Sequence, residues 1–252
     1  QQATLSFIPT PLIIDPMWRT LRSMTQSISQ VKATLQYRYD DSGESGREWV
    51  TLTADSEGTR TIRALSELDD VGLRRDATIT YGPGFRAQDG YIHMAQHGAF
   101  LGSGWFRFGK NVVTLEGMTA TEGRISQRMD FDEPIGIFAP HPVFLDGWHA
   151  TQHDPNGPAV QDLRNCITSS PLWHGASGPM ICAQHRRIER LPDEEMTVAA
   201  GTFACETYHL IPHAPNRPPI EFWVHGPHKI FVKLRWDHLR ATYELTELLT
   251  RE

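Results

Sequence analysis

Cysteine is scarce in this chain of 252 residues. The three cysteines, Cys166, Cys182 and Cys205, are odd in number and contain no CxxC pair. This pattern is not that of a disulfide framework, and it lacks the ligand spacing of a zinc site. Because unpaired thiols persist in reducing compartments, we expect a cytoplasmic protein.

The chain also lacks an excess of basic charge and any long apolar run. Its formal net charge is -6, with 24 Lys and Arg against 30 Asp and Glu, which argues against nucleic acid or an anionic membrane as a partner. No run approaches the ~20 apolar residues of a membrane-spanning helix. The first residues, QQATLSFIPTPLIIDPMW, lack the order of a signal peptide, although the missing initiator Met weakens this argument against secretion.

Motifs for cofactors and for common nucleophiles are absent as well. The sequence contains neither HExxH nor GxSxG, and the glycine-rich YGPGF (81–85) lacks the Lys-Ser/Thr pair and the following helix of a phosphate loop. The string GASGP (175–179) lacks the spacing of a serine hydrolase elbow, so Ser169 and Ser170 are poor candidates for a nucleophile. We therefore expect no cofactor and no metal.

The sequence instead contains many short segments that alternate apolar and polar residues, for example VKATLQYRYDD (31–41), REWVTLTADSE (47–57) and GTRTIRALSEL (58–68). Turn residues separate such segments at Gly82-Pro83-Gly84, His97-Gly98, Glu122-Gly123 and Gly226-Pro227. Strands repeated every ~8–12 residues are typical of a meander that closes into a barrel or sandwich. We predict an all-β fold in a single domain (1–252), an antiparallel lipocalin-like barrel or half-barrel of about a dozen strands.

Two segments depart from this rhythm. Residues 1–30 predict a short N-terminal helix, with Asp15 as its cap and Pro16 in its first turn. Residues 133–179 show little alternation apart from a helix expected around Phe144 to His153. A long segment of this kind inside a compact domain is usually functional or disordered, and its aromatic residues argue against disorder. We expect it to cap one end of the barrel and to roof a ligand cavity.

The segments VAAGTFACETYHL (198–210), EFWVHGPHKIFVKLRW (221–236), ATYELTEL (241–248) and GSGWFRF (102–108) carry a resemblance to a known group. From Val71 to the end, the chain resembles uncharacterised proteobacterial proteins with a lipocalin-like or lipoprotein-carrier-like antiparallel half-barrel. The resemblance implies this fold and a tendency to hold an apolar small molecule, but it assigns no catalytic residue. Relatives in aromatic-degrading bacteria suggest, by analogy, a lyase that acts on lignin-derived aromatics.

The insertion contains four histidines: His141, His149, His153 and His174. A neutral imidazole is a natural general acid or base near neutral pH. Trp148, Trp173 and Phe138 would enclose an aromatic ligand beside these histidines. The alternative is that each histidine bonds a loop carbonyl and has no chemical role. We expect the segment SSPLWHGASGPM (169–180) to form a rigid lid that carries Trp173 and His174 to the barrel mouth.

The strand Gly102 to Phe108 places Ser103, Trp105 and Arg107 on one face. We expect this face to line the lumen, where Arg107 would bind a carboxylate or phenolate in bidentate fashion and Tyr91 would contact the substrate. The alternative is an exposed face with a partly covered Trp105. The run HRRIER (185–190) indicates a solvated strand at the edge of the sheet.

Three functions remain open from the sequence. The first is a cofactor-independent lyase or isomerase for a hydrophobic, aromatic small molecule, in which His141, His174 or His149 moves a proton and Arg107 stabilises an oxyanion. The second is a carrier of an apolar small molecule without chemistry. The third is a metal-dependent enzyme using His149, His153 and a distant ligand, with Asp146 or Asp154 as a further carboxylate. A homodimer through exposed barrel edges is compatible with all three.

Overall fold

The computed structural model describes residues 29–212 and 217–251. The helix predicted in residues 1–30 therefore falls outside the described residues, apart from Ser29 and Gln30, which begin the first strand.

The first eight strands follow one another as hairpins: β1 (Ser29–Tyr39), β2 (Gly43–Ala54), β3 (Arg60–Leu68), β4 (Leu73–Gly82), β5 (Arg86–Gln96), β6 (Ala99–Phe108), β7 (Val112–Thr119) and β8 (Gly123–Asp130). The predicted turns occur between them: His97 (φ 51°) and Gly98 (φ 79°) turn β5 into β6, and Gly123 (φ 72°) begins β8. A 3-10 turn, η1 (Pro83–Phe85), joins β4 to β5.

The described residues of the second half form two short helices and seven strands: α2 (Val143–Asp146), η2 (Gly147–Gln152), β9 (Val160–Thr168), β10 (Cys182–Arg190), β11 (Glu194–Val198), β12 (Gly201–Pro212), β13 (Ile220–His225), β14 (Ile230–Trp236) and β15 (Ala241–Arg251). The last strand, β15, pairs with β1, so the two halves form one antiparallel sheet of fifteen strands. Its order is β8-β7-β6-β5-β4-β3-β2-β1-β15-β14-β13-β12-β10-β9, and β11 pairs with β12 beside this path.

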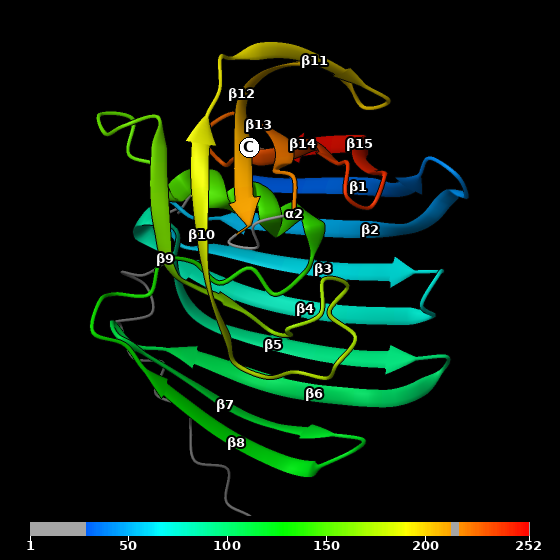
Figure 1. The fold of residues 1–252 in the computed structure, drawn as a ribbon, viewed down its shortest axis with the longest axis vertical. Coiled ribbons are helices and arrows are strands. Elements are labelled where there is room, and N and C mark those ends of the chain that lie inside the picture. Colours follow the sequence, from blue (N-terminus) through cyan, green and yellow to red (C-terminus); the bar gives the residue numbers. More distant parts are fainter. Residues whose placement is uncertain (1–28, 213–216, 252) are drawn as a thin grey trace, which may run out of the picture.

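The sheet is strongly curved. In Figure 1, β1 to β8 run across the view, whereas β9, β10 and β12 run nearly at right angles to them. This rotation is the accumulated twist of an open sheet of many strands. The helices α2 and η2 lie between the two layers: the first N–H groups of α2 donate to a carboxylate on β2, and η2 contacts β13 and β14. The predicted all-β antiparallel half-barrel is confirmed.

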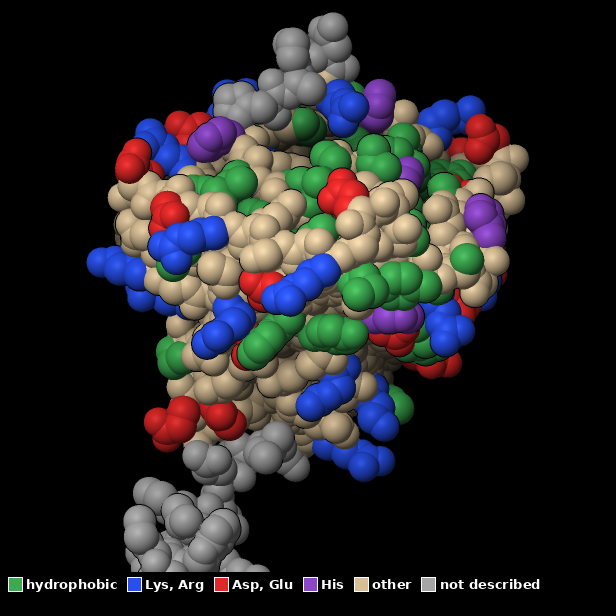
Figure 2. All heavy atoms as spheres, turned by 90° about the horizontal axis from the view of Figure 1, so that it is seen from below, with side chains coloured by type: hydrophobic (Ala, Val, Ile, Leu, Met, Phe, Trp, Pro, Cys, Tyr) green, Lys and Arg blue, Asp and Glu red, His purple; other side chains and the backbone are tan. Residues whose placement is uncertain are grey.

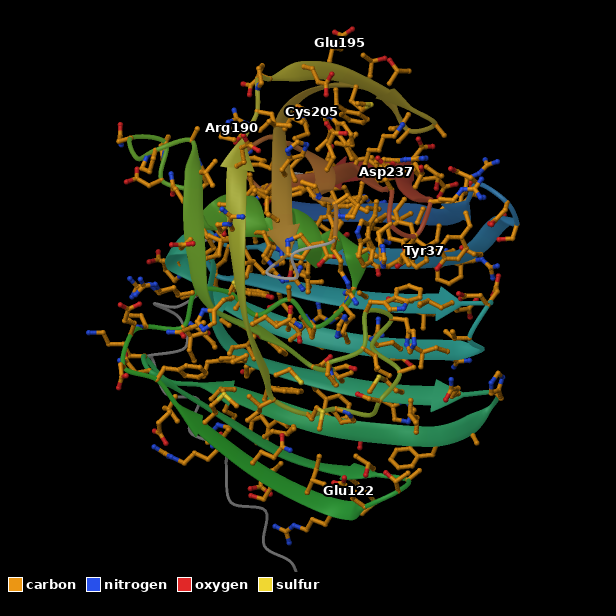
Figure 3. The ribbon with its side chains drawn as sticks, in the orientation of Figure 1. Tyr37, Glu122, Arg190, Glu195, Cys205 and Asp237 are labelled. Carbon is orange, nitrogen blue, oxygen red and sulfur yellow. The ribbon has the colours of Figure 1, made fainter. Side chains whose placement is uncertain are left out.

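Alternate residues of the strands face the concave side, where side chains fill the space between the layers (Figure 3). On β4 the buried residues are Leu73, Arg75, Ala77, Ile79 and Tyr81. The buried apolar residues of all the described strands form one cluster with α2 and η2. The insertion therefore completes the core of the half-barrel and does not lie over it as a loose flap.

A row of polar side chains crosses this apolar interior. Glu48 on β2 lies opposite Ser66 on β3, and Ser66 lies opposite Arg75 on β4. The three side chains are 0%, 0% and 1% exposed, respectively. Burying charges without partners is costly, so this row needs partners from another part of the chain.

The insertion differs from its prediction in one respect. Residues 160–168 form β9, which pairs with β10 and is the last strand of the sheet, so this part of the insertion is regular. The alternation is broken at Asn165 (φ 52°), where the register with β10 shifts, and this break hides the strand in the sequence. The helix expected at 144–153 is present as α2 followed by η2.

The prediction that HRRIER forms a sheet edge is wrong. These residues lie on β10, which pairs with β9 on one side and with β12 on the other. The outermost strands of the path are β8 and β9, and the outer side of β9 bonds the backbone of residues 136–139. One face of β10 looks into the molecule, which brings Arg186 to the interior.

Candidate functional site

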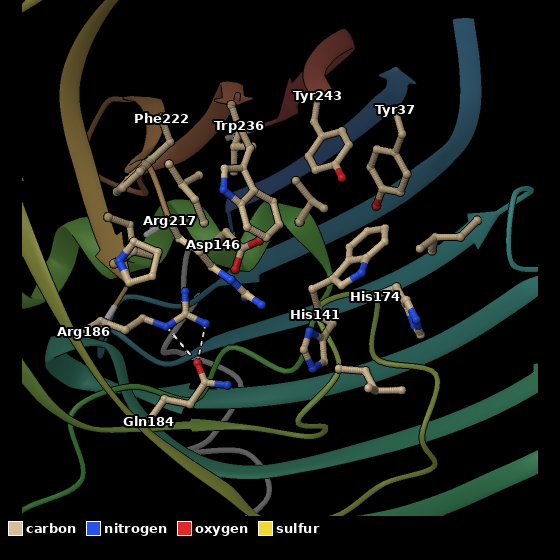
Figure 4. A pocket seen from close by; sticks show the side chains of 18 of the residues that line it. Tyr37, His141, Asp146, His174, Gln184, Arg186, Arg217, Phe222, Trp236 and Tyr243 are labelled. Carbon is tan, nitrogen blue, oxygen red and sulfur yellow. Dashed lines mark hydrogen bonds between the residues drawn. The ribbon is translucent and has the colours of Figure 1, made fainter. Parts of the chain in front are cut away.

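A cavity of about 420 Å³ lies between the concave side of the sheet and the insertion. Its walls come from β1 to β4, from the insertion, and from β10 and β12 to β15. Figure 4 shows its side chains, with Arg186 and Gln184 on one side and His174 on the other. This volume falls within the range of small-molecule sites in proteins.

One part of the cavity wall is apolar. It is formed by inward-facing residues of neighbouring strands: Leu210 on β12, Ile220 and Phe222 on β13, and Leu234 and Trp236 on β14. These residues lie side by side because β12, β13 and β14 are adjacent antiparallel strands. This wall suits an apolar ligand body.

Other parts of the wall are polar. Three arginines line the cavity, Arg75 from β4, Arg186 from β10 and Arg217 from the segment before β13. The acidic residues in the wall are Asp70 and Asp146. The cavity therefore combines an apolar body with a small number of charged groups.

Arg75 is almost completely buried and holds two loops of the insertion. Its Nη1 donates a hydrogen bond to the carbonyl of His141 (3.1 Å), and its Nη2 donates to the carbonyl of His174 (2.6 Å). Its Nε is buried and has no partner among the described residues. Burial lowers the pKa of Arg75 from its usual value, an effect that the neighbouring Tyr37 and Glu48 oppose.

Glu48 fixes the start of α2. Its carboxylate accepts hydrogen bonds from the backbone N–H of Val143 (2.9 Å) and Phe144 (3.0 Å), and from the hydroxyls of Tyr37 (2.7 Å) and Ser66 (2.8 Å). Burial raises its pKa, while these four bonds act in the opposite direction. Glu48 is thus saturated with donors and serves to attach the insertion to the sheet.

Asp146, the last residue of α2, also lines the cavity. Burial raises the pKa of its carboxyl to about 7, with a further increase from Glu48, whereas the charges of Arg186 and Arg75 lower it. Near neutral pH this carboxyl therefore exchanges its proton easily. A group of this kind in a cavity can act as a general acid or base.

His141 and His174, both predicted to be catalytic, line the cavity. His141 has a left-handed backbone (φ 72°), and its Nε2 lies 3.3 Å from the carbonyl of Ser170. Burial, and next the charge of Arg75, lower the pKa of His141 to about 3, so its ring is neutral. Burial also lowers the pKa of His174, whose Nδ1 accepts a hydrogen bond from the backbone N–H of Ala176 (3.1 Å).

Hydrogen bonds within the segment 169–180 fix its conformation. Ser170 and Ser177 share a hydroxyl–hydroxyl bond of 2.6 Å, and the N–H of Met180 donates to the carbonyl of Ser169 (3.0 Å). Pro179 packs against Gly104 of β6, where a Cβ would lie 3.2 Å from the proline ring. The segment carries Trp173 and His174 to the cavity wall.

Three other predicted site residues lie in the core and do not line the cavity. Trp148 is fully buried, and its Nε1 donates to the carbonyl of His228 (3.1 Å). Phe138 is fully buried between the rings of Phe106 and Phe108. His149 is 2% exposed, and its Nδ1 bonds the carbonyl of Asp146 (2.9 Å). These three residues therefore belong to the core.

The prediction that Ser103, Trp105 and Arg107 line the lumen is wrong. Trp105 is 47% exposed, Arg107 stacks over its ring, and Tyr91 lies directly opposite Trp105 on β5 with 49% exposure. None of the four lines the cavity. The inward residues of β6 are instead glycines and Phe106, because Pro179 approaches the strand closely. On the face drawn in Figure 2, hydrophobic side chains lie next to Lys and Arg.

The described residues contain no cluster of ligands for the metal-dependent alternative. Within residues 29–212 and 217–251, no group of three or more His, Cys, Asp or Glu side chains could hold a metal ion. His149 and His153 do not converge, since His149 is in the core and His153 lies 3.3 Å from the carbonyl of Ala159. In the same residues, no helix is long and apolar enough to span a membrane.

Arg75 and Arg186 were not predicted as site residues, and Asp146 was considered only as a further carboxylate for a metal ion. A signal for Arg75 was available, because strict alternation along Leu73 to Tyr81 places it among the inward residues Ala77 and Ile79. A charged residue at an inward position needs a partner or a ligand. No comparable signal exists for Asp146, whose position depends on the contact between α2 and β2.

Comparisons with known proteins identify a fold and no activity. No protein-family model and no curated protein match the sequence. A beta-barrel-like protein of domain of unknown function DUF1849 from Brucella abortus is similar in structure, with a TM-score of 0.52 and 10% identity over 89% of this chain and 98% of that chain. A "putative lipoprotein" from Parabacteroides distasonis reaches a TM-score of 0.30 with 11% identity over 89% and 96% of the two chains.

The first of these likenesses supports the predicted relation to uncharacterised antiparallel barrel-like proteins at the level of the fold. Neither neighbour provides a link to lyases of aromatic degradation.

Proposed function

We propose that this protein binds an apolar small molecule in the cavity between its sheet and its insertion, as a carrier or binding protein. The observation that supports this proposal is the cavity of about 420 Å³, with an apolar wall from β12 to β14 and a few charged groups elsewhere in its lining. Such a combination buries a ligand body and fixes its orientation.

A neutral fluorescent probe such as Nile red tests the proposal. We expect saturable binding, with a rise in emission as the probe leaves water. Ile220→Trp should reduce this binding at least about tenfold, because Ile220 lines the cavity and is only partly buried, so the larger ring occupies the ligand space.

Leu249→Trp is the matched control, since Leu249 is 66% exposed and lies outside the cavity. Absence of saturable binding by the folded protein, or equal binding by the two variants, would contradict the proposal.

A second candidate function is a cofactor-independent lyase or isomerase. It is favoured by Asp146, which lines the cavity with a pKa of about 7, and by the neutral rings of His141 and His174, which line the same cavity. In this function Asp146 moves a proton and a histidine positions the substrate. The aromatic, lignin-derived substrate class belongs to this second candidate.

Incubation with a panel of such aromatics, followed by mass spectrometry, distinguishes the two functions. Product formation by the wild type that is lost in Asp146→Asn and in His141→Ala would establish the enzyme. Probe binding without any product would favour the carrier.

Location and assembly are further proposals. The three cysteines are unpaired, which is compatible with a reducing cytoplasm. Among the described residues, β8 has no strand on its outer side, and a homodimer could form through this edge. Light scattering after gel filtration would measure the mass in solution.

A further inference from the structure

The arginines of the cavity lack acidic partners. Within the described residues, no carboxylate lies within ion-pair distance of Arg75 or Arg186, whereas surface arginines such as Arg47 and Arg235 have such partners. Among the described residues, Arg186 forms side-chain hydrogen bonds only with the neutral amide oxygen of Gln184, through Nε at 2.9 Å and through Nη2. A guanidinium held in this way keeps its full charge available to a ligand.

Both guanidinium groups act on the same region of the cavity. The charges of Arg75 and Arg186 each lower the pKa of Asp146, and each lowers the pKa of His141. All four residues line the cavity. The positive charges of Arg75 and Arg186 thus act together on Asp146 and His141.

The acidic groups nearby do not neutralise this charge. Glu48 already accepts four hydrogen bonds, and it lies behind the cavity wall. Burial raises the pKa of Asp146 to about 7, so its carboxyl is only partly ionised near neutral pH. Three arginines then face two aspartates, of which one is partly neutral.

Buried polar atoms without hydrogen-bond partners also indicate that the ligand supplies an acceptor. Among the residues that line the cavity, two buried side-chain atoms have no hydrogen-bond partner within the described residues, Nε of Arg75 and Nε1 of Trp236. Both are N–H donors. A buried donor without an acceptor costs about 1–3 kcal/mol, which a purely hydrocarbon ligand would not relieve.

We infer that the ligand of this cavity is an amphipathic acid, with a carboxylate or phosphate head bound by Arg186 and by the free Nε of Arg75, and with an apolar body against Leu210, Phe222 and Leu234. This inference rests on the proposed function, because it specifies the ligand of the same cavity. A charged acceptor in a partly buried site forms strong bidentate bonds with guanidinium groups.

Competition against Nile red with a matched series of decanoate, decyl phosphate and decanol tests the inference. We expect at least one of the two acids to displace the probe at a concentration at least about tenfold lower than decanol. The acid that binds more tightly identifies the head group. Equal displacement by decanol and by both acids would overturn the inference and leave the proposed function intact, whereas failure of Nile red and of all three compounds to bind would overturn both.

Variants of two neighbouring arginines locate the head group. Arg75 also holds the carbonyls of His141 and His174, so its replacement would disturb the loops, and Arg186 is the better choice. Arg186→Met should weaken the acid about tenfold and leave decanol unchanged. Arg187→Met is the control, because Arg187 is exposed and does not line the cavity. An unchanged preference for the acid in Arg186→Met would overturn the assignment.

Discussion

The carboxylate of Glu48 accepts a hydrogen bond of 2.9 Å from the backbone N–H of Val143, a residue 95 positions later in the chain. The other carboxylate oxygen accepts from the next N–H, that of Phe144 (3.0 Å). This pair of bonds joins β2 to the first turn of α2. It determines where the insertion meets the sheet, and hence where the cavity forms.

Glu48→Gln should destabilise the fold by about 3 kcal/mol. Each carboxylate oxygen of Glu48 accepts one backbone N–H, so the amide group of Gln places a donor against a donor whichever way it is turned. Urea unfolding measures the change. Glu122→Gln, at the exposed turn between β7 and β8 (Figure 3), is the control and should change stability by less than about 0.5 kcal/mol. Equal effects would mean that Glu48 does not anchor α2.

Gly175→Ala, in the lid segment 169–180, should destabilise the protein more than an alanine at another left-handed glycine does. A Cβ at Gly175 (φ 77°) would lie 2.2 Å from Nη2 of Arg75 and 2.8 Å from the ring of His141. Gly123→Ala provides the matched comparison, because Gly123 has a similar φ of 72° and open space around its Cβ position.

We expect Gly123→Ala to cost about 1–2 kcal/mol and Gly175→Ala clearly more. Thermal unfolding of the two variants measures the difference. Similar melting temperatures would show that the lid segment moves away from Arg75 without cost.

Asp146 should make stability depend on pH. Its folded pKa of about 7 lies above the ordinary value of 3.8, so the folded state binds the proton more tightly than the unfolded state does. The resulting contribution is fully present below about pH 4 and is lost as the pH rises through about 7. The wild type should therefore lose more stability than Asp146→Asn between these pH values.

Denaturant unfolding at a series of pH values gives this difference directly, since the other titrating groups are common to both proteins. Asp132→Asn, which changes an exposed carboxyl, should follow the wild type. Parallel curves for the wild type and Asp146→Asn would contradict the prediction.

The three thiols should react slowly with a disulfide reagent in the native protein. Burial raises the pKa of Cys166 and of Cys205 to about 11 and also raises the pKa of Cys182, so little thiolate is present at neutral pH. Cys182 should react first, because it is the least buried of the three. All three should react at once in strong denaturant. Rapid reaction of two thiols in the native state would show that the half-barrel opens.

The strands and their turns could be predicted because both are local properties. Alternation from Val31 onward, and turn residues such as His97-Gly98 and Gly226-Pro227, occur where the hairpins are. The strand β9 was not predicted, because its alternation of apolar and polar residues breaks at Asn165. The cavity histidines His141 and His174 were named because they lie in a segment without strand pattern.

The orientation of β6 could not be predicted in the same way. Alternation shows that Ser103, Trp105 and Arg107 share a face, but it does not show which face is inside. Both faces of this strand contain aromatic residues, so hydrophobicity gives no decision. The close approach of Pro179 to Gly104 decides it, and these two residues are far apart in the chain.

The sequence by itself determined the all-β architecture, because backbone conformation at each strand and turn depends on neighbouring residues. Only the tertiary structure decided that Arg75, Asp146 and Arg186 surround one cavity, since these residues come from β4, α2 and β10. Their proximity depends on the curvature of the sheet and on the attachment of α2 to Glu48, and both arise from contacts between distant segments.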